Sequence, residues 1–559
     1  MPYAAETKRV DRSGTSAIPV HEQITEVFLF KTTYVMGEVI QTAMDTARTR
    51  GRKSGFPAAL FWGLIVAERA AGSAPRLLRQ LEVKSIWEAI GENYAAMTGG
   101  DRLPLRPPNR DQLDHFKQRL LKLDLLPSLQ DMFRRCALGQ AWEHGNLLPG
   151  RECAFARPEE EHMIYGDGTV VAPYSKVRTV TDPWDPTGEK ILLGSRAKKG
   201  SPRIQNFFSD MSEDGKQVRG VNMVSVHTWT SWGRIVLGTA TAMRAEQWAA
   251  LEIIEAVAAR AKDGLHSVVW DRALTGWTVD YLMASHRVQV FGKAVARGQE
   301  KSDDESQYKE EPADSPDGSS RFLHRKSVQD ERARRLAAEL GVNRSADTLR
   351  LLRYDHLAKI HAGTMPAPVG TNVYQSAKGH LQASYGKTYY LPAVTHLTDT
   401  GVCRHELVID DGSLYTVGTH PIEEYPVKED HLPCQSSTAF QTASGRWGRR
   451  NEYVVACEHG PVAYTHVWEP RAERGAPDTP SPERVDPAGS ELRPLARRDP
   501  EFTPFCGRRS DAESYNAWYK GTLPIHGRAA SESLRAQELD FLAAAVLNNS
   551  NTMSRRSRG

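Results

Sequence analysis

Three charged residues near the C-terminus have a spacing suited to chemistry on a phosphodiester. Arg509, Glu513 and Lys520 stand in the segment FCGRRSDAESYNAWYKGTLP, with three and then six residues between them. At roughly 100° per residue, a helix brings all three side chains onto one face. The carboxylate of such a face can hold Mg²⁺ while the two cations neutralise a DNA backbone. The alternative is a solvated helix with an ordinary i, i+4 Arg–Glu pair.

Two upstream aspartates favour the metal-binding interpretation. Asp167 lies in the expected strand MIYGDGTVV between two glycines, and Asp271 ends the short apolar strand in SVVWDRAL. If the first strand is central and the later strand runs parallel beside it, both carboxylates emerge near one another, and a helix across that edge could add Glu513. Three carboxylates can hold two Mg²⁺ ions roughly 4 Å apart, with Mn²⁺ able to substitute. Taken singly, Asp167 could be a turn residue and Asp271 a helix cap.

The hydrophobic periodicity predicts the elements that position these residues. Residues 21–155 have apolar positions at three- and four-residue steps, which indicates a helical N-terminal domain. Residues 156–295 predict the order βββαβαβ, with a tight turn between the second and third strands. The sequence therefore predicts an α/β core.

The rest of the chain divides by composition. Residues 1–20 are expected to be disordered, 296–365 an acidic linker and helical segment, 366–470 a β-rich insertion, 471–500 a Pro- and Arg-rich linker, 501–548 the second part of the core with the Glu513 helix, and 549–559 a basic tail. Residues 336–353 have the cadence of a helix-turn-helix, or of an ordinary helical hairpin.

The net charge of the chain is only +3, so a nucleic-acid surface has to come from local clusters. Lys198 and Lys199 belong to one such cluster, a basic loop expected between the first two strands. This loop could lie along DNA, or it could be a solvated hairpin connection. The longest apolar run, which begins at Phe56, is about 12 residues and too short to span a bilayer. We expect a cytoplasmic protein with no membrane segment.

The predicted order of elements, the β-rich insertion and the Arg-x3-Glu-x6-Lys helix together resemble the RNase H-like DDE transposases of bacterial insertion sequences. The resemblance is greatest to the group whose last motif is Tyr-x2-Arg-x3-Glu-x6-Lys, and it covers residues 160–295 and 500–548. It implies a metal-binding catalytic triad of Asp167, Asp271 and Glu513. The tyrosine position of the motif is filled here by Cys506.

The resemblance also implies a function. The chain would be a transposase that binds double-stranded DNA at terminal inverted repeats, cleaves it, and transfers the strand to target DNA as a homodimer on paired ends, associated with the bacterial nucleoid. Its N-terminal domain would bind DNA, and Arg509 and Lys520 would contact the backbone of the transposon end. Trp447 would help to hold a flipped base, or it is a plain surface residue. The alternatives are a domesticated or decayed transposase that only binds DNA, and an RNase H-like nuclease.

The insertion also contains three Cys/His pairs: Cys403 with His405, His431 with Cys434, and Cys457 with His459. Zinc takes such ligands, but two of the pairs are separated by one residue instead of the usual two to four. Alternation along a strand would still place both members of a Cys-x-His pair on one face. We expect buried cysteines and surface histidines here, with structural zinc as the alternative.

Overall fold

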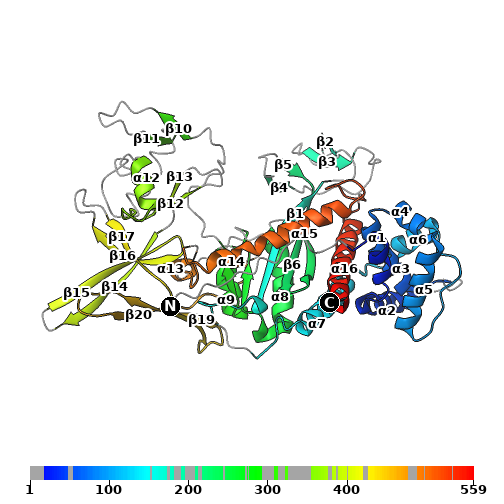
Figure 1. Cartoon of the computed structure of the whole chain (residues 1–559), viewed down its shortest axis with the longest axis horizontal. Helices are drawn as coiled ribbons and strands as arrows, with labels where there is room; N and C mark the ends of the chain where they lie inside the picture. The colour runs from blue at the N-terminus through cyan, green and yellow to red at the C-terminus, as the bar shows by residue number, and fades with distance from the viewer. Residues whose placement is uncertain are drawn as a thin grey trace. The chain divides into compact units, whose positions relative to one another are not determined.

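The computed structural model describes residues 18–47, 55–150, 154–172, 177–181, 190–194, 208–211, 217–242, 246–270, 273–274, 276–292, 308–311, 321–324, 354–375, 381–385, 388–398, 401–419, 426–475, 487–496, 498–531 and 533–558. These residues form a mixed α/β protein with a helical N-terminal part and several β-sheets (Figure 1). The chain divides into two compact units, one of Met1–Asn146, Gly166–Val257 and Asp511–Gly559, the other of Leu147–Tyr165 and Ala258–Ser510.

The N-terminal part is helical, as its periodicity predicts. Its helices are α1 (Val20–Glu26), α2 (Lys31–Thr46), α3 (Ala58–Ala71), α4 (Ala74–Leu81), α5 (Lys84–Thr98), α6 (Arg110–Lys122) and α7 (Leu126–Glu143). Helix α3 contains most of the longest apolar run and is buried along almost its whole length. It ends at Gly72, whose φ of 78° is readily adopted only by glycine. Asn109 begins α6 with a capping box.

A mixed five-stranded sheet follows in the predicted order βββαβαβ. Its elements are β1 (Met163–Val171), β6 (Val221–Thr230), β7 (Gly233–Ala242), α8 (Glu246–Ala261), β8 (Ser267–Val269), α9 (Trp277–His286) and β9 (Gln289–Phe291), with short 3-10 turns at Glu160–His162 and Lys262–Gly264. The strand order is β7-β6-β1-β8-β9. Strands β6 and β7 are antiparallel, whereas β8 runs parallel to both β1 and β9. The expectation of a central first strand with a parallel neighbour is confirmed.

Two short hairpins lie between β1 and β6, where the sequence predicts only a basic loop. They pair β2 (Val177–Thr181) with β3 (Lys190–Gly194), and β4 (Phe208–Met211) with β5 (Gln217–Arg219). Lys198 and Lys199 fall in residues 195–207, between these hairpins and outside the described residues.

The region from 308 to 468 is rich in strands. Two hairpins, β10 (Tyr308–Glu311) with β11 (Arg321–His324) and β12 (Thr371–Gln375) with β13 (Leu381–Tyr385), flank helix α12 (Tyr354–His361) in sequence. The helix-turn-helix expected at 336–353 lies outside the described residues. The first hairpin falls within the segment that composition marks as an acidic linker, because alternation in so polar a sequence is weak.

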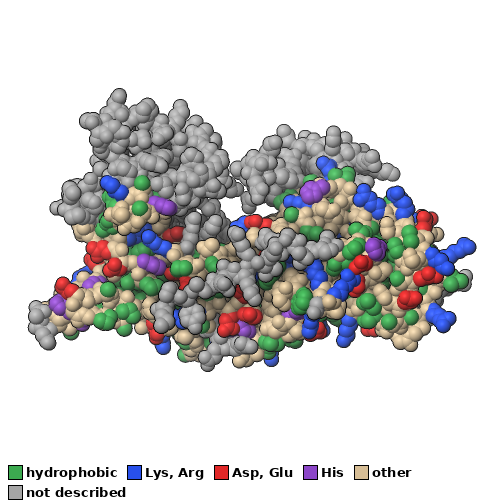
Figure 2. Space-filling view, in the orientation of Figure 1, with side chains coloured by type: hydrophobic (Ala, Val, Ile, Leu, Met, Phe, Trp, Pro, Cys, Tyr) green, Lys and Arg blue, Asp and Glu red, His purple; other side chains and the backbone are tan. Residues whose placement is uncertain are grey.

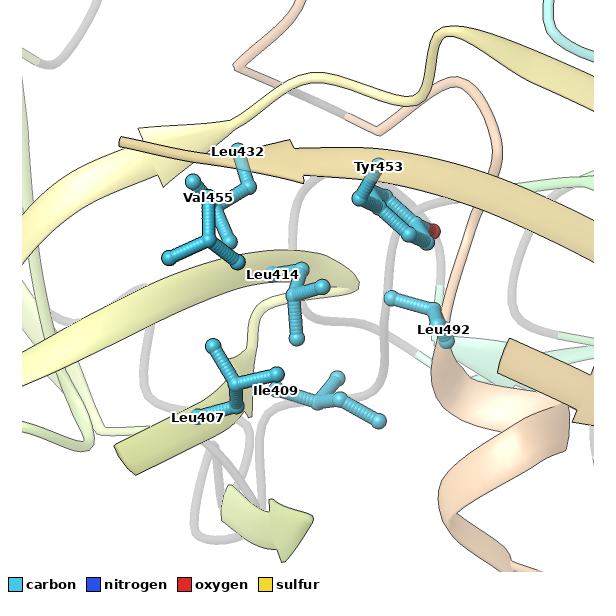
Figure 3. Packing of buried hydrophobic residues seen from close by; sticks show 7 residues of the cluster. All are labelled: Leu407, Ile409, Leu414, Leu432, Tyr453, Val455 and Leu492. Atoms are coloured by element: carbon cyan, nitrogen blue, oxygen red, sulfur yellow. The ribbon is translucent and has the colours of Figure 1, made fainter. Parts of the chain in front are cut away.

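Two antiparallel sheets form the body of this β-rich region. One contains β14 (Thr388–Thr398), β15 (Gly401–Asp410), β16 (Ser413–Thr419) and β17 (Pro426–Leu432), and the other β18 (Ser436–Gln441), β19 (Trp447–Val455) and β20 (Val462–Trp468). Their apolar faces share one core. Figure 3 shows Leu407, Leu414 and Leu432 of the first sheet gathered with Tyr453 and Val455 of the second, and Leu432 lies beside Val455. The predicted β-rich insertion is therefore a two-sheet sandwich.

The C-terminal part contains α13 (Pro487–Glu491), α14 (Phe502–Gly507), α15 (Arg509–Thr522) and α16 (Leu534–Arg558). Helix α16 packs against α3, α7 and β7. The Asn549 side chain accepts a hydrogen bond from the backbone N–H of Val236 at 2.8 Å and donates one to its carbonyl at 2.9 Å. An amide side chain thus satisfies the edge of β7 as a further strand would.

The closing residues expected as a basic tail are the last turns of α16 instead. Arg558 binds Glu22 at 2.7 Å and Glu26 at 2.8 Å, both on α1, and Arg556 binds Glu143 on α7 at 3.2 Å. Two arginines of this basic segment, Arg556 and Arg558, therefore pair with acidic residues of the N-terminal helices. Composition alone could not show this, because the partners lie more than 400 residues away.

A buried ion cluster joins the same helices. Arg69 of α3 is fully buried and contacts Glu68 at 2.6 Å and Asp540 of α16 at 3.4 Å, while Lys117 of α6 binds the other oxygen of Glu68. Burial alone would raise the pKa of Glu68, but Arg69 and Lys117 outweigh it and lower that pKa. The pKa of Asp540 is raised by burial, against the opposing effect of Arg69.

Replacing Arg69 by Met should destabilise the protein by about 3–5 kcal/mol, because Asp540 then remains buried without its cation and Glu68 keeps only Lys117. The loss should be largest near neutral pH, where both carboxylates of the variant carry charge, and shrink as acid protonates them. For Glu68, whose pKa is lowered in the wild type, the stabilising contribution is lost as pH falls. Urea unfolding at several pH values measures it. Arg110→Met is the control, since the Arg110–Asp114 pair is exposed and is worth at most about 1 kcal/mol. Equal losses in the two variants would contradict a structural role for the cluster.

Candidate active site

The motif helix α15 contacts the strand that carries Asp167. Asn516 of α15 donates a hydrogen bond from Nδ2 to the Oδ2 of Asp167 at 3.0 Å. Asp167 is half-buried in β1, and Asn516 is buried. The two residues are 349 positions apart in the chain. This contact brings the first expected carboxylate of the triad beside the helix that carries the last.

The packing of α15 determines which of its residues can reach the neighbourhood of Asp167. Its buried residues are Ala512, Tyr515, Asn516, Tyr519 and Thr522. Measured around the helix axis from Asn516, Arg509 lies at about 20°, Lys520 at about 40° and Glu513 at about 60°, on the side away from the other buried residues. The Arg-Glu-Lys face therefore begins where the buried stripe ends, next to the Asp167 contact. Glu513 is exposed, whereas Arg509 and Lys520 are half-buried.

The helix is fixed to the sheet by Arg234 and Tyr515. Arg234 of β7 donates to the carbonyl of Asp511 and, at 2.6 Å, to the hydroxyl of Ser514. Its guanidinium also lies 6.0 Å from the ring centroid of the fully buried Tyr515. Three contacts to one turn of α15 set both its position and its rotation, and hence the direction in which its charged face points.

The side chains of the sheet that lie against Tyr515 are buried. The ring of His227 on β6 meets that of Tyr515 edge-on, with centroids 4.8 Å apart, and its Nε2 lies 2.9 Å from the hydroxyl of Ser225. Burial, with nearby Arg234, holds the pKa of His227 well below its usual range. Burial likewise raises the pKa of Tyr515 well above its usual range. Both side chains are therefore neutral at physiological pH and act as packing for α15.

Two residues that the sequence analysis did not select belong to this site. Asn516 is one. The other is Glu246, at the start of α8, whose carboxylate fills the space beside Gly168 and accepts a hydrogen bond from Asn222 at 3.3 Å. A Cβ on Gly168 would lie 2.2 Å from Oε2 of Glu246, so a side chain at this position would have to displace the Glu246 carboxylate. The glycine after Asp167 was the signal in the sequence that something packs closely there.

The remaining predicted site residues fall elsewhere. Asp271 lies outside the described residues, one position after Trp270, which is buried at the end of β8. Lys198 and Lys199 are also outside the described part. Trp447 begins β19 and is half-buried, with the guanidinium of Arg287 5.2 Å from its ring centroid. One face of this ring therefore already interacts with a cation.

The arginine that precedes the motif is engaged by an acid. Arg508 forms a two-point ion pair with Glu160, at 3.1 and 2.9 Å, just before β1. Arg509, by contrast, begins α15 on the face of Glu513. Two adjacent arginines therefore have different surroundings, which makes them a matched pair for experiments.

Lys and Arg side chains are also visible over the N-terminal helices, at the right of Figure 2, interspersed with acidic and apolar side chains. Among the helices of the described ranges, none has the length and apolarity needed to cross a membrane.

No protein-family model matches this chain, and no curated protein is significantly similar to it.

Asn516→Asp should make the stability of the protein depend on pH and on Mg²⁺. The substitution places a second carboxylate beside Asp167 and removes a hydrogen bond to a charged group, which contributes about 1.5–3 kcal/mol. Like charges resist joint ionisation, so the loss should be greatest at neutral pH and decrease in acid, and millimolar Mg²⁺ should offset part of it. Denaturant unfolding with and without Mg²⁺ measures these effects.

The control for this substitution is Ala517→Asp, which adds the same charge one residue further along, at an exposed position. It should change stability little, and its response to pH should follow the wild type. If the two variants respond alike to pH and Mg²⁺, Asn516 does not adjoin the carboxylate of Asp167.

Proposed function

We propose that this chain is a DDE transposase, which binds the ends of a mobile DNA element and catalyses metal-dependent strand cleavage and strand transfer. The observation that carries the proposal is the hydrogen bond from Asn516 to Asp167. It supports a site in which Asp167 and Glu513 act together, although they are separated by most of the chain. An Arg-Glu-Lys helix on a solvated surface would have no reason to adjoin a strand carboxylate.

The strand order supports an RNase H-like core. Tyr165 of β1 and Val269 of β8 are register partners in parallel strands. Asp167 follows Tyr165 by two residues, and Asp271 follows Val269 by two. Equal steps from paired positions of parallel strands lead toward the same edge of a sheet. This supports Asp271 as the second carboxylate of the proposed triad.

The proposed chemistry assigns separate roles to the charged residues. Asp167, Asp271 and Glu513 would be the ligands of two Mg²⁺ ions, which supply Lewis acidity and activate the attacking oxygen. In cleavage, water attacks phosphorus and the 3′-oxygen leaves as a hydroxyl. In transfer, that 3′-hydroxyl attacks a phosphodiester of the target, so one P–O bond forms as another breaks. Arg509 and Lys520 would bind backbone phosphates beside Glu513.

Single replacement of Asp167, Asp271 or Glu513 by Ala should reduce strand cleavage at least about 100-fold. Binding of element ends should stay within a factor of about three, because the phosphate contacts lie elsewhere. The assay uses the full chain, Mg²⁺ or Mn²⁺, and DNA fragments from either side of the gene, where terminal repeats would lie.

Asp511→Ala is the control for these variants, because Asp511 lies on the opposite side of α15 at about 140° from Asn516. It should leave cleavage unchanged. Normal activity in any of the three variants removes that residue from the triad. Cleavage by the wild type without strand transfer would identify a nuclease, and binding without cleavage would identify a decayed transposase.

Replacing Arg509 or Lys520 by Gln should weaken end binding and flatten the plot of log affinity against log salt by about 0.9 for each lost phosphate contact. Sequence preference should barely change. Arg508→Gln is the matched control, since its guanidinium is held by Glu160 and its loss should not alter the slope. Fluorescence anisotropy over a range of salt concentrations measures all three. Equal slopes in all variants and the wild type would exclude these two residues from the DNA contact.

A further inference from the structure

At one end of the insertion sandwich, cysteines take the place of the apolar residues that form its core. On β15, Leu407 and Ile409 face the shared core, and by strand alternation Cys403 points to the same side. On β19, Tyr453 and Val455 face the core, and Cys457 lies two residues beyond the end of this strand. Where both sheets would otherwise continue an apolar core, each presents a cysteine.

A histidine of the neighbouring strand joins these cysteines. His396 of β14 is the register partner of Cys403 on β15. Its Nδ1 lies 3.4 Å from the Sγ of Cys457, which belongs to the other sheet. The contact therefore crosses from one sheet of the sandwich to the other, and it involves residues 61 positions apart.

The turn between β19 and β20 brings two further candidate ligands near Cys403. The ligand atoms of Cys403, Glu458 and His459 all lie within 4.8 Å of one another. The pKa of Cys403 is raised, by burial and then by nearby Cys457 and Glu458. A carboxylate oxygen of Glu458 lies 3.3 Å from Nε2 of His459, so Nδ1 is the nitrogen of that ring that could bind a metal ion. Carboxylates commonly hold metal-binding histidines in this way.

We propose that His396, Cys403, Cys457 and His459 bind one zinc ion between the two sheets of the insertion. Two thiolates and two imidazoles are a common tetrahedral zinc set, and Zn–S and Zn–N bonds of about 2.3 and 2.0–2.1 Å place S and N about 3.6 Å apart. The observed separation of 3.4 Å between His396 and Cys457 is close to that value. The soft thiolates favour zinc over Mg²⁺.

The proposed ligand set differs from the pairs that the sequence suggests. Cys403 is joined by Cys457 and His396 across strands, instead of by His405 alone. The pair His431 and Cys434 does not take part: Cys434 donates its thiol hydrogen to the carbonyl of Ser436 at 3.0 Å, and His431 lies 3.8 Å from Asp499. Cys434 is therefore a half-buried cysteine of the same sandwich that serves as a control.

The zinc would stabilise an end of the sandwich that has little apolar packing. Leu397 and Val402, at the tip of the β14–β15 hairpin, are 77% and 63% exposed. A metal bound by β14, β15 and the β19–β20 turn closes a large loop, and its binding energy adds directly to the stability of the fold. This role does not depend on the proposed transposase activity.

Metal analysis of the full chain, purified under reducing conditions and freed of loose metal by gel filtration, tests the site. The wild type and Cys434→Ser should each contain about one zinc per chain, and the double variant Cys403→Ser/Cys457→Ser close to none. If the double variant fails to fold, His459→Gln provides the test instead, because His459 is at a more exposed position. This variant should bind zinc more weakly than the wild type. Co²⁺ added to metal-free protein should give a thiolate-to-cobalt charge-transfer band in the wild type and in Cys434→Ser only.

Three outcomes would overturn the proposal. Wild-type protein without bound zinc after growth in zinc-supplemented medium is the first. Zinc content that survives in the double variant and in His459→Gln is the second. A Cys403–Cys457 disulfide in reduced preparations, detected by peptide mass mapping, would assign the two thiols to a covalent bond instead.

Discussion

The docking of α15 on the sheet determines where the charged residues of the motif can act. Helix α15 has a buried stripe through Ala512, Tyr515 and Tyr519, which allows only one rotation of the helix about its axis. Arg234 fixes that rotation by binding the backbone carbonyl of Asp511 and the hydroxyl of Ser514. Asn516 lies at the border of the stripe and contacts Asp167. Any change that rotates α15 would move Glu513 relative to β1 without altering a single motif residue. The site therefore depends on packing residues that have no chemical role of their own.

A second set of contacts holds the elements around this helix. Helix α16 follows α15 in the chain, satisfies the edge of β7 through Asn549, and brings Asp540 to the buried Arg69 of α3. Such a buried ion pair is weak as a source of net stability, since desolvation offsets most of its attraction. It does disfavour incorrect packing of the helices, however, because a misplaced helix would leave a buried charge without its partner. The N-terminal helices are thus packed on the C-terminal helix, although composition marks them as a separate domain.

The sequence predicted the parts of the structure that repeat. Alternation and helical periodicity identified the order of the core strands, and a step of about 100° per residue placed Arg509, Glu513 and Lys520 on one face. Single polar residues could not be predicted in this way. Asn516 and Asn549 owe their roles to partners that are hundreds of positions away, and nothing in their neighbours distinguishes them from solvated asparagines. The triad and the transposase activity remain proposals, with Asp271 outside the described residues.

The cysteines show why local spacing can mislead. Metal motifs are usually recognised as pairs close in sequence, but in a sandwich the residues that approach one another come from different strands, as His396 and Cys457 do. The proposed zinc ligands are soft and the proposed catalytic ligands are carboxylates, so each site should select its own metal. A chelator that strips both metals would abolish the proposed cleavage by removing Mg²⁺, whether or not the zinc is also needed. Because thiolates are poor ligands for Mg²⁺, added Mg²⁺ would restore the catalytic site alone. The activity then recovered would show whether the insertion needs its zinc for catalysis.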